Sequence, residues 1–73
     1  MDRIKHLNCA DEALLRAERL AGYAEDAAHS HNDRHRAEPF AAVGALWADI
    51  ARTHAALAAA LPEQTDETED TDV

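Results

Sequence analysis

Residues 40–61 read FAAVGALWADIARTHAALAAAL, and their large side chains recur at alternating steps of three and four. The recurring positions are Phe40, Val43, Trp47, Ile50, His54, Leu57 and Leu61. This spacing places side chains on one face of an α-helix and is close to the seam of a coiled coil. Alanine, which fills 18 positions of the 73-residue chain, favours helix further because it loses no side-chain entropy there. The pattern predicts a helix over about residues 38–61.

The first half of the chain repeats this spacing with smaller side chains. The apolar positions are Leu7, Ala10, Leu14, Ala17, Ala21, Ala24 and Ala28, with Ala13, Leu20 and Ala27 beside them. Most of the charged residues fall outside this stripe, which is typical of an amphipathic helix. We expect a helix over about residues 9–29 with Asn8 as its N-cap, although Ile4 and Leu7 equally allow an earlier start.

A polar segment separates the two patterns at residues 30–37, where Ser30, Asn32 and Asp33 can compete for backbone hydrogen bonds. A connection this short makes the two helices antiparallel neighbours. The bulky second stripe complements the narrow first stripe, so we expect the helix axes to approach to about 8 Å. The sequence therefore predicts an all-α fold, an antiparallel two-helix hairpin over residues 1–61.

The C-terminal residues 62–73 contain six acidic residues, no basic residue and no large apolar residue before Val73. Such a segment cannot bury enough apolar surface to offset the entropy lost on ordering, so we expect a disordered acidic tail. The tail also accounts for most of the net charge of −8, because the remainder carries nine acids against seven Lys and Arg. The charge therefore says little about a binding face on the hairpin.

One interhelical seam is a small core for a chain of this length, so the hairpin is expected to need a partner. The favoured interpretation is self-association into a four-helix bundle. The predicted interaction residues are Phe40, Val43, Trp47, Ile50, Leu57, Leu61, Leu14 and Leu20. Two alternatives stay open for the partner: an unidentified protein, as for a phage or accessory-element regulator that binds a host protein, or no partner, with the alanines serving only as exposed helix formers.

Three histidines near the turn suggest a second hypothesis, a metal-responsive helical protein. They are His29, His31 and His35, and the last two have the i,i+4 spacing that places two imidazoles on one helical face. The competing interpretation is that all three are solvated turn residues. His54, within the apolar stripe of residues 40–61, would need hydrogen-bond partners if buried.

Other functions are disfavoured by what the sequence does not contain. Cys9 and His6 lack an orienting third group, and no nucleophile motif or phosphate-binding glycine loop occurs, so we expect neither enzymatic activity nor a cofactor. Arg52 alone on the second helix could not read a DNA groove, which disfavours nucleic acid as a partner. The apolar stretch at residues 39–61 carries Asp49 and Arg52, and residues 1–6 do not resemble a secretory signal, so we expect no membrane association and a cytoplasmic location.

Three segments also carry a resemblance to a group of known proteins. These are ALLRAERL at residues 13–20, HRAEPF at residues 35–40 and the alanine-rich stretch at residues 42–61. Together they resemble short uncharacterised helical proteins of actinobacteria and their phages over residues 10–61. The resemblance implies a helical hairpin and brings no activity or binding residue with it.

Overall fold

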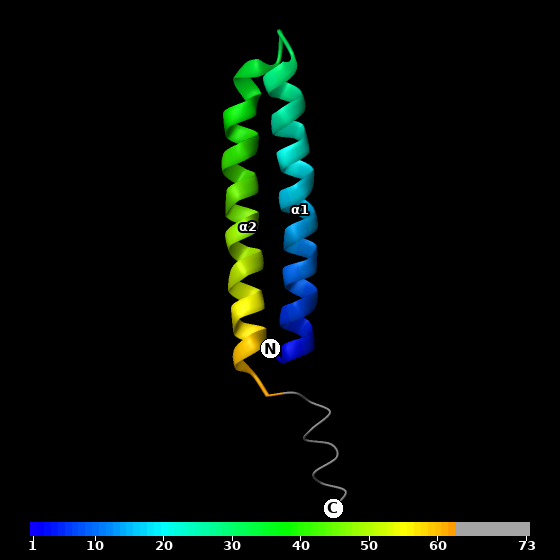
Figure 1. The fold of residues 1–73 in the computed structure, drawn as a ribbon, viewed down its shortest axis with the longest axis vertical. Helices are drawn as coiled ribbons and strands as arrows, with labels where there is room; N and C mark the ends of the chain where they lie inside the picture. Colours follow the sequence, from blue (N-terminus) through cyan, green and yellow to red (C-terminus); the bar gives the residue numbers. More distant parts are fainter. Residues whose placement is uncertain (63–73) are drawn as a thin grey trace, which may run out of the picture.

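The computed structural model describes residues 1–62, which form two long helices joined at one end (Figure 1). Helix α1 spans Arg3–His29, the short 3-10 helix η1 spans Arg34–Arg36, and helix α2 spans Ala37–Ala60. The start of α1 and the end of α2 lie at the same end of the molecule, opposite the loop (Figure 1). The described part of the chain contains no strand. The predicted all-α hairpin is confirmed, whereas the predicted tail falls on residues 63–73, outside the described residues.

Helix α1 begins six residues before the predicted start at residue 9. The carboxylate of Asp2 accepts a hydrogen bond from the backbone N–H of Lys5 at 2.8 Å, which satisfies one of the free donors of the first turn. Asn8 lies inside the helix and is not its N-cap, and the structure adopts the earlier start that Ile4 and Leu7 allowed. The physical reason is that both Asp2 and Asn8 can cap, and the earlier cap lets Ile4 and Leu7 join the helix.

The loop is closed by short local hydrogen bonds. The N–H of Ser30 donates to the carbonyl of Ala27 at 3.1 Å and ends α1. The hydroxyl of Ser30 then accepts a hydrogen bond from the N–H of Asp33 at 3.3 Å, and the carbonyl of Asp33 accepts from the N–H of Arg36 at 2.8 Å. Pro39 lies in the first turn of α2, where its missing N–H would have had no intrahelical partner.

Small residues fill the seam between the two helices. The buried residues are Ala10, Ala13, Ala17 and Ala27 on α1 and Gly44, Ala51 and Ala58 on α2. On α2 they alternate with larger, half-buried residues, which are Phe40, Trp47 and His54, and the half-buried Leu61 follows as the C-cap. No large side chain among residues 1–62 is fully buried. The helices can therefore approach closely, but the core that they enclose is small.

The predicted seam is wrong at every second position. On α2, Gly44, Ala51 and Ala58 lie in the seam in place of the predicted Val43, Ile50 and Leu57, one residue further along the chain in each case. On α1 the positions are displaced in the other direction, to His6, Ala13, Leu20 and Ala27 in place of Leu7, Leu14, Ala21 and Ala28. The reason is steric, because alanine and glycine in the contact let the two backbones come closer than bulky side chains would.

Candidate association surface

The displaced seam leaves large apolar side chains on one flank of the hairpin. We call this surface the bulky face and define it by Tyr23 on α1 and Val43, Leu46, Ile50 and Leu57 on α2. Their exposed fractions lie between 41% for Ile50 and 62% for Leu46. Contiguous exposed apolar side chains of this size are typical of surfaces that contact another molecule.

The α2 part of the bulky face continues as a stripe without charge. Its positions follow the helical spacing of three and four and are Val43, Leu46, Ile50, Thr53, Leu57 and Ala60. All six are exposed, and none carries a charge. The spacing is that of a helix face prepared for a further helix, in addition to the face already packed on α1.

Two hollows lie where the bulky face meets the seam. One, of about 200 Å³, is lined by residues that include Cys9 and Glu12 on α1 and Trp47, Ile50 and His54 on α2. The other, of about 420 Å³, lies at the loop end, and its lining includes Tyr23 and Phe40. The rings of Tyr23 and Phe40 have centroids 5.6 Å apart and planes tilted by 54°, which is an ordinary aromatic contact.

Arg16 covers the indole ring of Trp47. Its guanidinium carbon lies 4.7 Å from the ring centroid, and the same guanidinium forms an ion pair with Glu12 at 2.8 Å. This cation–π contact holds the only tryptophan at the edge of the bulky face. Trp47 is half-buried, so part of its ring remains available to a partner.

The opposite flank is an open trough, which we call the alanine groove. Its lining is apolar except for Asp11, Glu18 and Arg52, and consists otherwise of Leu7, Ala10, Leu14, Ala17, Ala21, Ala24, Ala41, Gly44, Ala45, Ala48, Ala51 and Ala55. The trough has two hollows, of about 540 and 380 Å³, that meet at Ala48. The bulky face and the alanine groove thus flank the seam on either side.

The predicted interaction residues are divided among three surfaces. Val43, Ile50 and Leu57 lie on the bulky face, whereas Leu14, with 48% of its surface exposed, lines the alanine groove. The rest are half-buried along the seam, namely Leu20, Phe40, Trp47 and Leu61. Only the bulky face gathers several of the predicted large residues in one exposed surface.

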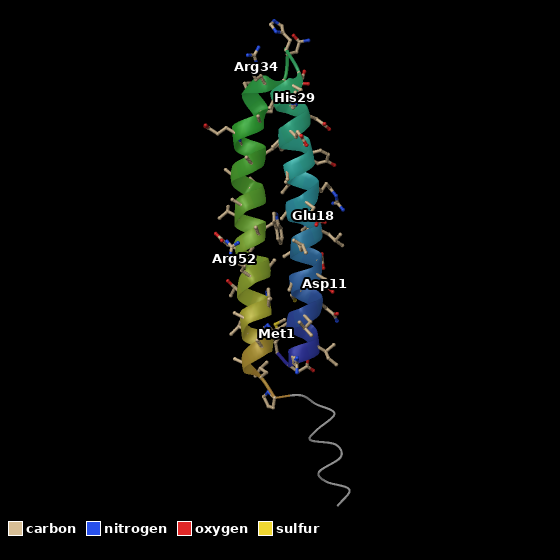
Figure 2. All side chains as sticks on the ribbon, viewed as in Figure 1. Met1, Asp11, Glu18, His29, Arg34 and Arg52 are labelled. Carbon is tan, nitrogen blue, oxygen red and sulfur yellow. The ribbon has the colours of Figure 1, made fainter. Side chains whose placement is uncertain are left out.

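The structure does not bring the three turn histidines together as a metal site. Nδ1 of His29 forms a hydrogen bond with the carbonyl of Glu25 at 2.8 Å, and Nδ1 of His31 lies 3.4 Å from the guanidinium of Arg34. His35 is exposed within η1. Figure 2 shows His29 and Arg34 at the loop end of the hairpin, opposite Met1. Within residues 1–62, no three His, Cys, Asp or Glu side chains form a group that could hold a metal ion.

A different histidine pair joins the helices at the other end of the molecule. Nδ1 of His6 and Nδ1 of His54 lie 2.9 Å apart and share a part-buried hydrogen bond. The sequence alone does not pair His6 with His54, because their pairing requires the register of the hairpin. A signal was present in the sequence, since an antiparallel fold about residues 30–33 places the first turn of one helix beside the last turns of the other.

Charged side chains of the described chain stay at its surface. No polar or charged residue among residues 1–62 is buried. The ion pairs Glu12–Arg16 and Asp49–Arg52 join side chains that are roughly half or more exposed, so each contributes little to stability. The charged side chains of residues 1–62 therefore surround the apolar surfaces of the hairpin without being buried in them.

The fold and these two flanks define the chain as an antiparallel helical hairpin with apolar surface on both sides of its seam. Comparison with protein-family models, curated proteins and solved structures finds no match. Neither helix of the described residues is long and apolar enough to cross a membrane.

Proposed function

We propose that this chain is a non-enzymatic self-association module in which two hairpins pair through their bulky faces. The product is a four-helix bundle with two-fold symmetry, the commonest arrangement of identical subunits. The supporting observation is the uncharged, exposed stripe on α2 that contains Val43, Leu46, Ile50 and Leu57.

The energetic argument rests on where the large side chains lie. The hairpin buries mainly alanine and glycine in its seam and leaves its bulkiest aliphatic residues about half exposed. Complete burial of a Val, Leu or Ile side chain contributes about 1.5 to 3 kcal/mol, so each half-exposed residue retains roughly 1 kcal/mol for a second contact. In a symmetric dimer every such residue is buried twice, once from each copy. The summed burial free energy is enough to offset a large part of the entropy lost on association.

The bulky face suits this pairing better than the alanine groove does. A bulky residue loses more apolar surface on contact than an alanine, and the α2 stripe has no charge to desolvate. Charges on α1 lie beside both surfaces, with Glu12 and Arg16 at the bulky face and Asp11 and Glu18 in the groove. The difference therefore comes from α2, whose groove side includes the guanidinium of Arg52. In a two-fold dimer the bulky face meets a second copy of itself, so Ile50 near its centre lies close to the symmetry axis.

The experiment is analytical ultracentrifugation of the full chain beside the variant Ile50→Asp. At protein concentrations of roughly 10 to 100 µM, this measurement detects a dimer whose association free energy is about 5.5 to 7 kcal/mol or more favourable. We expect the wild-type chain to sediment as a dimer and Ile50→Asp to sediment as a monomer, because two carboxylates would be buried without partners near the axis. Circular dichroism of each variant verifies that the helices persist.

The matched control is Ala41→Asp, which places the same carboxylate on the groove flank of α2. Ala41 is exposed and lines the alanine groove, so this variant should remain a dimer. A cooperatively folded wild-type monomer throughout this concentration range would refute the proposal. Loss of the dimer in Ala41→Asp but not in Ile50→Asp would show that the groove, and not the bulky face, is the contact.

A further inference from the structure

The histidine pair at the end opposite the loop has a geometry that goes beyond a structural hydrogen bond. His6 belongs to the first turns of α1 and His54 to the last turns of α2, so their contact links residues 48 positions apart. The ring centroids lie 5.2 Å apart, and the ring planes are tilted by 39°. Because the Nδ1 atoms are 2.9 Å apart, the two nitrogens lie close to the line that joins the ring centres.

Two nitrogens that face each other in this way can also share a cation. Zinc binds imidazole nitrogen at about 2.0 to 2.1 Å with tetrahedral geometry, which separates the nitrogens of two ligands by about 3.3 Å and their ring centres by about 5.2 Å. The ring centres of His6 and His54 already have that separation. Because the two nitrogens now face each other along that line, each ring must rotate by about 35° to turn its Nδ1 lone pair toward one shared ion at the tetrahedral angle.

We propose that His6 and His54 form a two-histidine site for a divalent transition-metal ion that accepts tetrahedral coordination, such as Zn²⁺. In the metal-free hydrogen bond, one Nδ1 carries a proton and donates it to the other. When both rings are neutral, binding moves that proton to Nε2 of the same ring through solvent, so no proton is released overall. The ion replaces the shared proton and clamps the two helix ends together.

The surroundings of the pair fit a partly open site. Both rings are half-buried, so one side of each remains accessible to an entering ion. Cys9 lies three residues after His6 on α1 and lines the same hollow as His54. Since the described residues contain no group of three ligands, water completes the coordination, and an affinity below that of a structural zinc site is expected.

The test is isothermal titration of the full chain with Zn²⁺, accompanied by thermal unfolding with and without the ion. We expect one ion per chain and a rise in Tm with Zn²⁺ concentration, because the ion binds the folded hairpin. The variants His6→Ala and His54→Ala should each weaken binding at least tenfold and abolish the rise in Tm.

The controls separate this site from other metal ligands in the chain. His31→Ala and His35→Ala remove the exposed histidines of the loop region and should leave the affinity unchanged. Cys9→Ala should retain binding. If Cys9→Ala lost binding while both histidine variants bound Zn²⁺ as the wild type does, a thiolate site would replace the proposed one. Unchanged affinity in His6→Ala would also overturn the proposal. The same titration on Val43→Asp, which alters the bulky face outside the hollow beside His54, should still show one ion per chain, so failure of self-association and failure of the metal site are distinguishable.

Discussion

Gly44 on α2 lies against Leu20 on α1 so closely that a Cβ atom at position 44 would be 3.3 Å from the Cβ of Leu20. The same added atom would be 3.6 Å from the carbonyl oxygen of Ala17. Neither neighbour is the flexible end of a side chain, so relief would require the two helices to separate by a few tenths of an ångström. The close approach of the helices at this point therefore depends on the absence of a side chain at position 44.

The two glycines of the chain form a matched pair for testing that approach. Gly22 has no atom within 4 Å of an added Cβ, so Gly22→Ala should raise the free energy of unfolding by about 0.5 to 1 kcal/mol through helix propensity alone. Gly44→Ala has the same intrinsic gain but must crowd Leu20, and we expect less than half of that increase. Gly44→Leu should destabilise the fold strongly. Urea denaturation of the variants measures all of these changes, and an equal gain at both glycines would contradict the close approach.

The N-terminal cap gives a second prediction. Asp2→Ala removes the acceptor of the Lys5 N–H and should lower the free energy of unfolding by about 1 kcal/mol. Asp2→Asn keeps a side-chain oxygen at the cap and should lose much less. Asn8→Ala is the contrasting change, because Asn8 lies inside α1 and its replacement by alanine should be neutral or slightly stabilising. Thermal denaturation monitored by circular dichroism compares the three, and a larger loss at Asn8 than at Asp2 would place the start of the helix further along the chain.

The contact between Arg16 and Trp47 gives a third prediction. Arg16→Ala should cost about 0.5 to 1 kcal/mol of stability, because the cation–π contact is lost and the ion pair with Glu12 adds little. It should also shift the fluorescence maximum of the single tryptophan to longer wavelength as water reaches the ring. Arg19→Ala on the exposed side of α1 is the control. Fluorescence that is identical in Arg16→Ala and the wild type would show that the guanidinium does not cover the indole.

The single cysteine reports on association without a mutation. Cys9 is half-buried and lines the hollow beside Ile50, at the edge of the bulky face. If that face pairs in the dimer, the rate at which Cys9 reacts with a thiol reagent should fall as protein concentration rises. The monomeric variant Ile50→Asp should react at one rate at all concentrations. A wild-type rate that is independent of concentration, in a sample shown to be dimeric, would place the contact elsewhere.

The helices and their antiparallel arrangement were predictable from local signals. The three-four spacing, the alanine content and the polar segment at residues 30–37 act within a few residues of one another, so they can be recognised in the linear chain. Pro39 and Pro62 bracket the second helix in the same way, and α2 indeed ends at Ala60. The beginning of α1 was misplaced because Asp2 and Asn8 are both competent caps, and only the folded chain shows which of them accepts the hydrogen bond.

The rotation of each helix about its axis could not be read from the sequence with the same precision. On α2 the apolar residues occupy two neighbouring stripes, one through Val43 and Ile50 and one through Gly44 and Ala51. Hydrophobicity favours the first stripe at the seam, whereas close approach of the backbones favours the second, and the structure adopts the second. The histidine pair was missed for a related reason, because His6 and His54 meet only once the register between the helices is fixed.

The apolar surfaces on both flanks of the seam bear on how large an assembly can become. If the bulky side chains of one copy entered the trough of alanines on the next, each added copy would present the same unfilled trough again, and growth would continue as a fibre. The carboxylates of Asp11 and Glu18 oppose that contact, since seating an apolar helix there would strip them of water. Asp11 and Glu18 on the α1 side of the alanine groove thus favour an assembly of fixed size over a fibre that keeps growing.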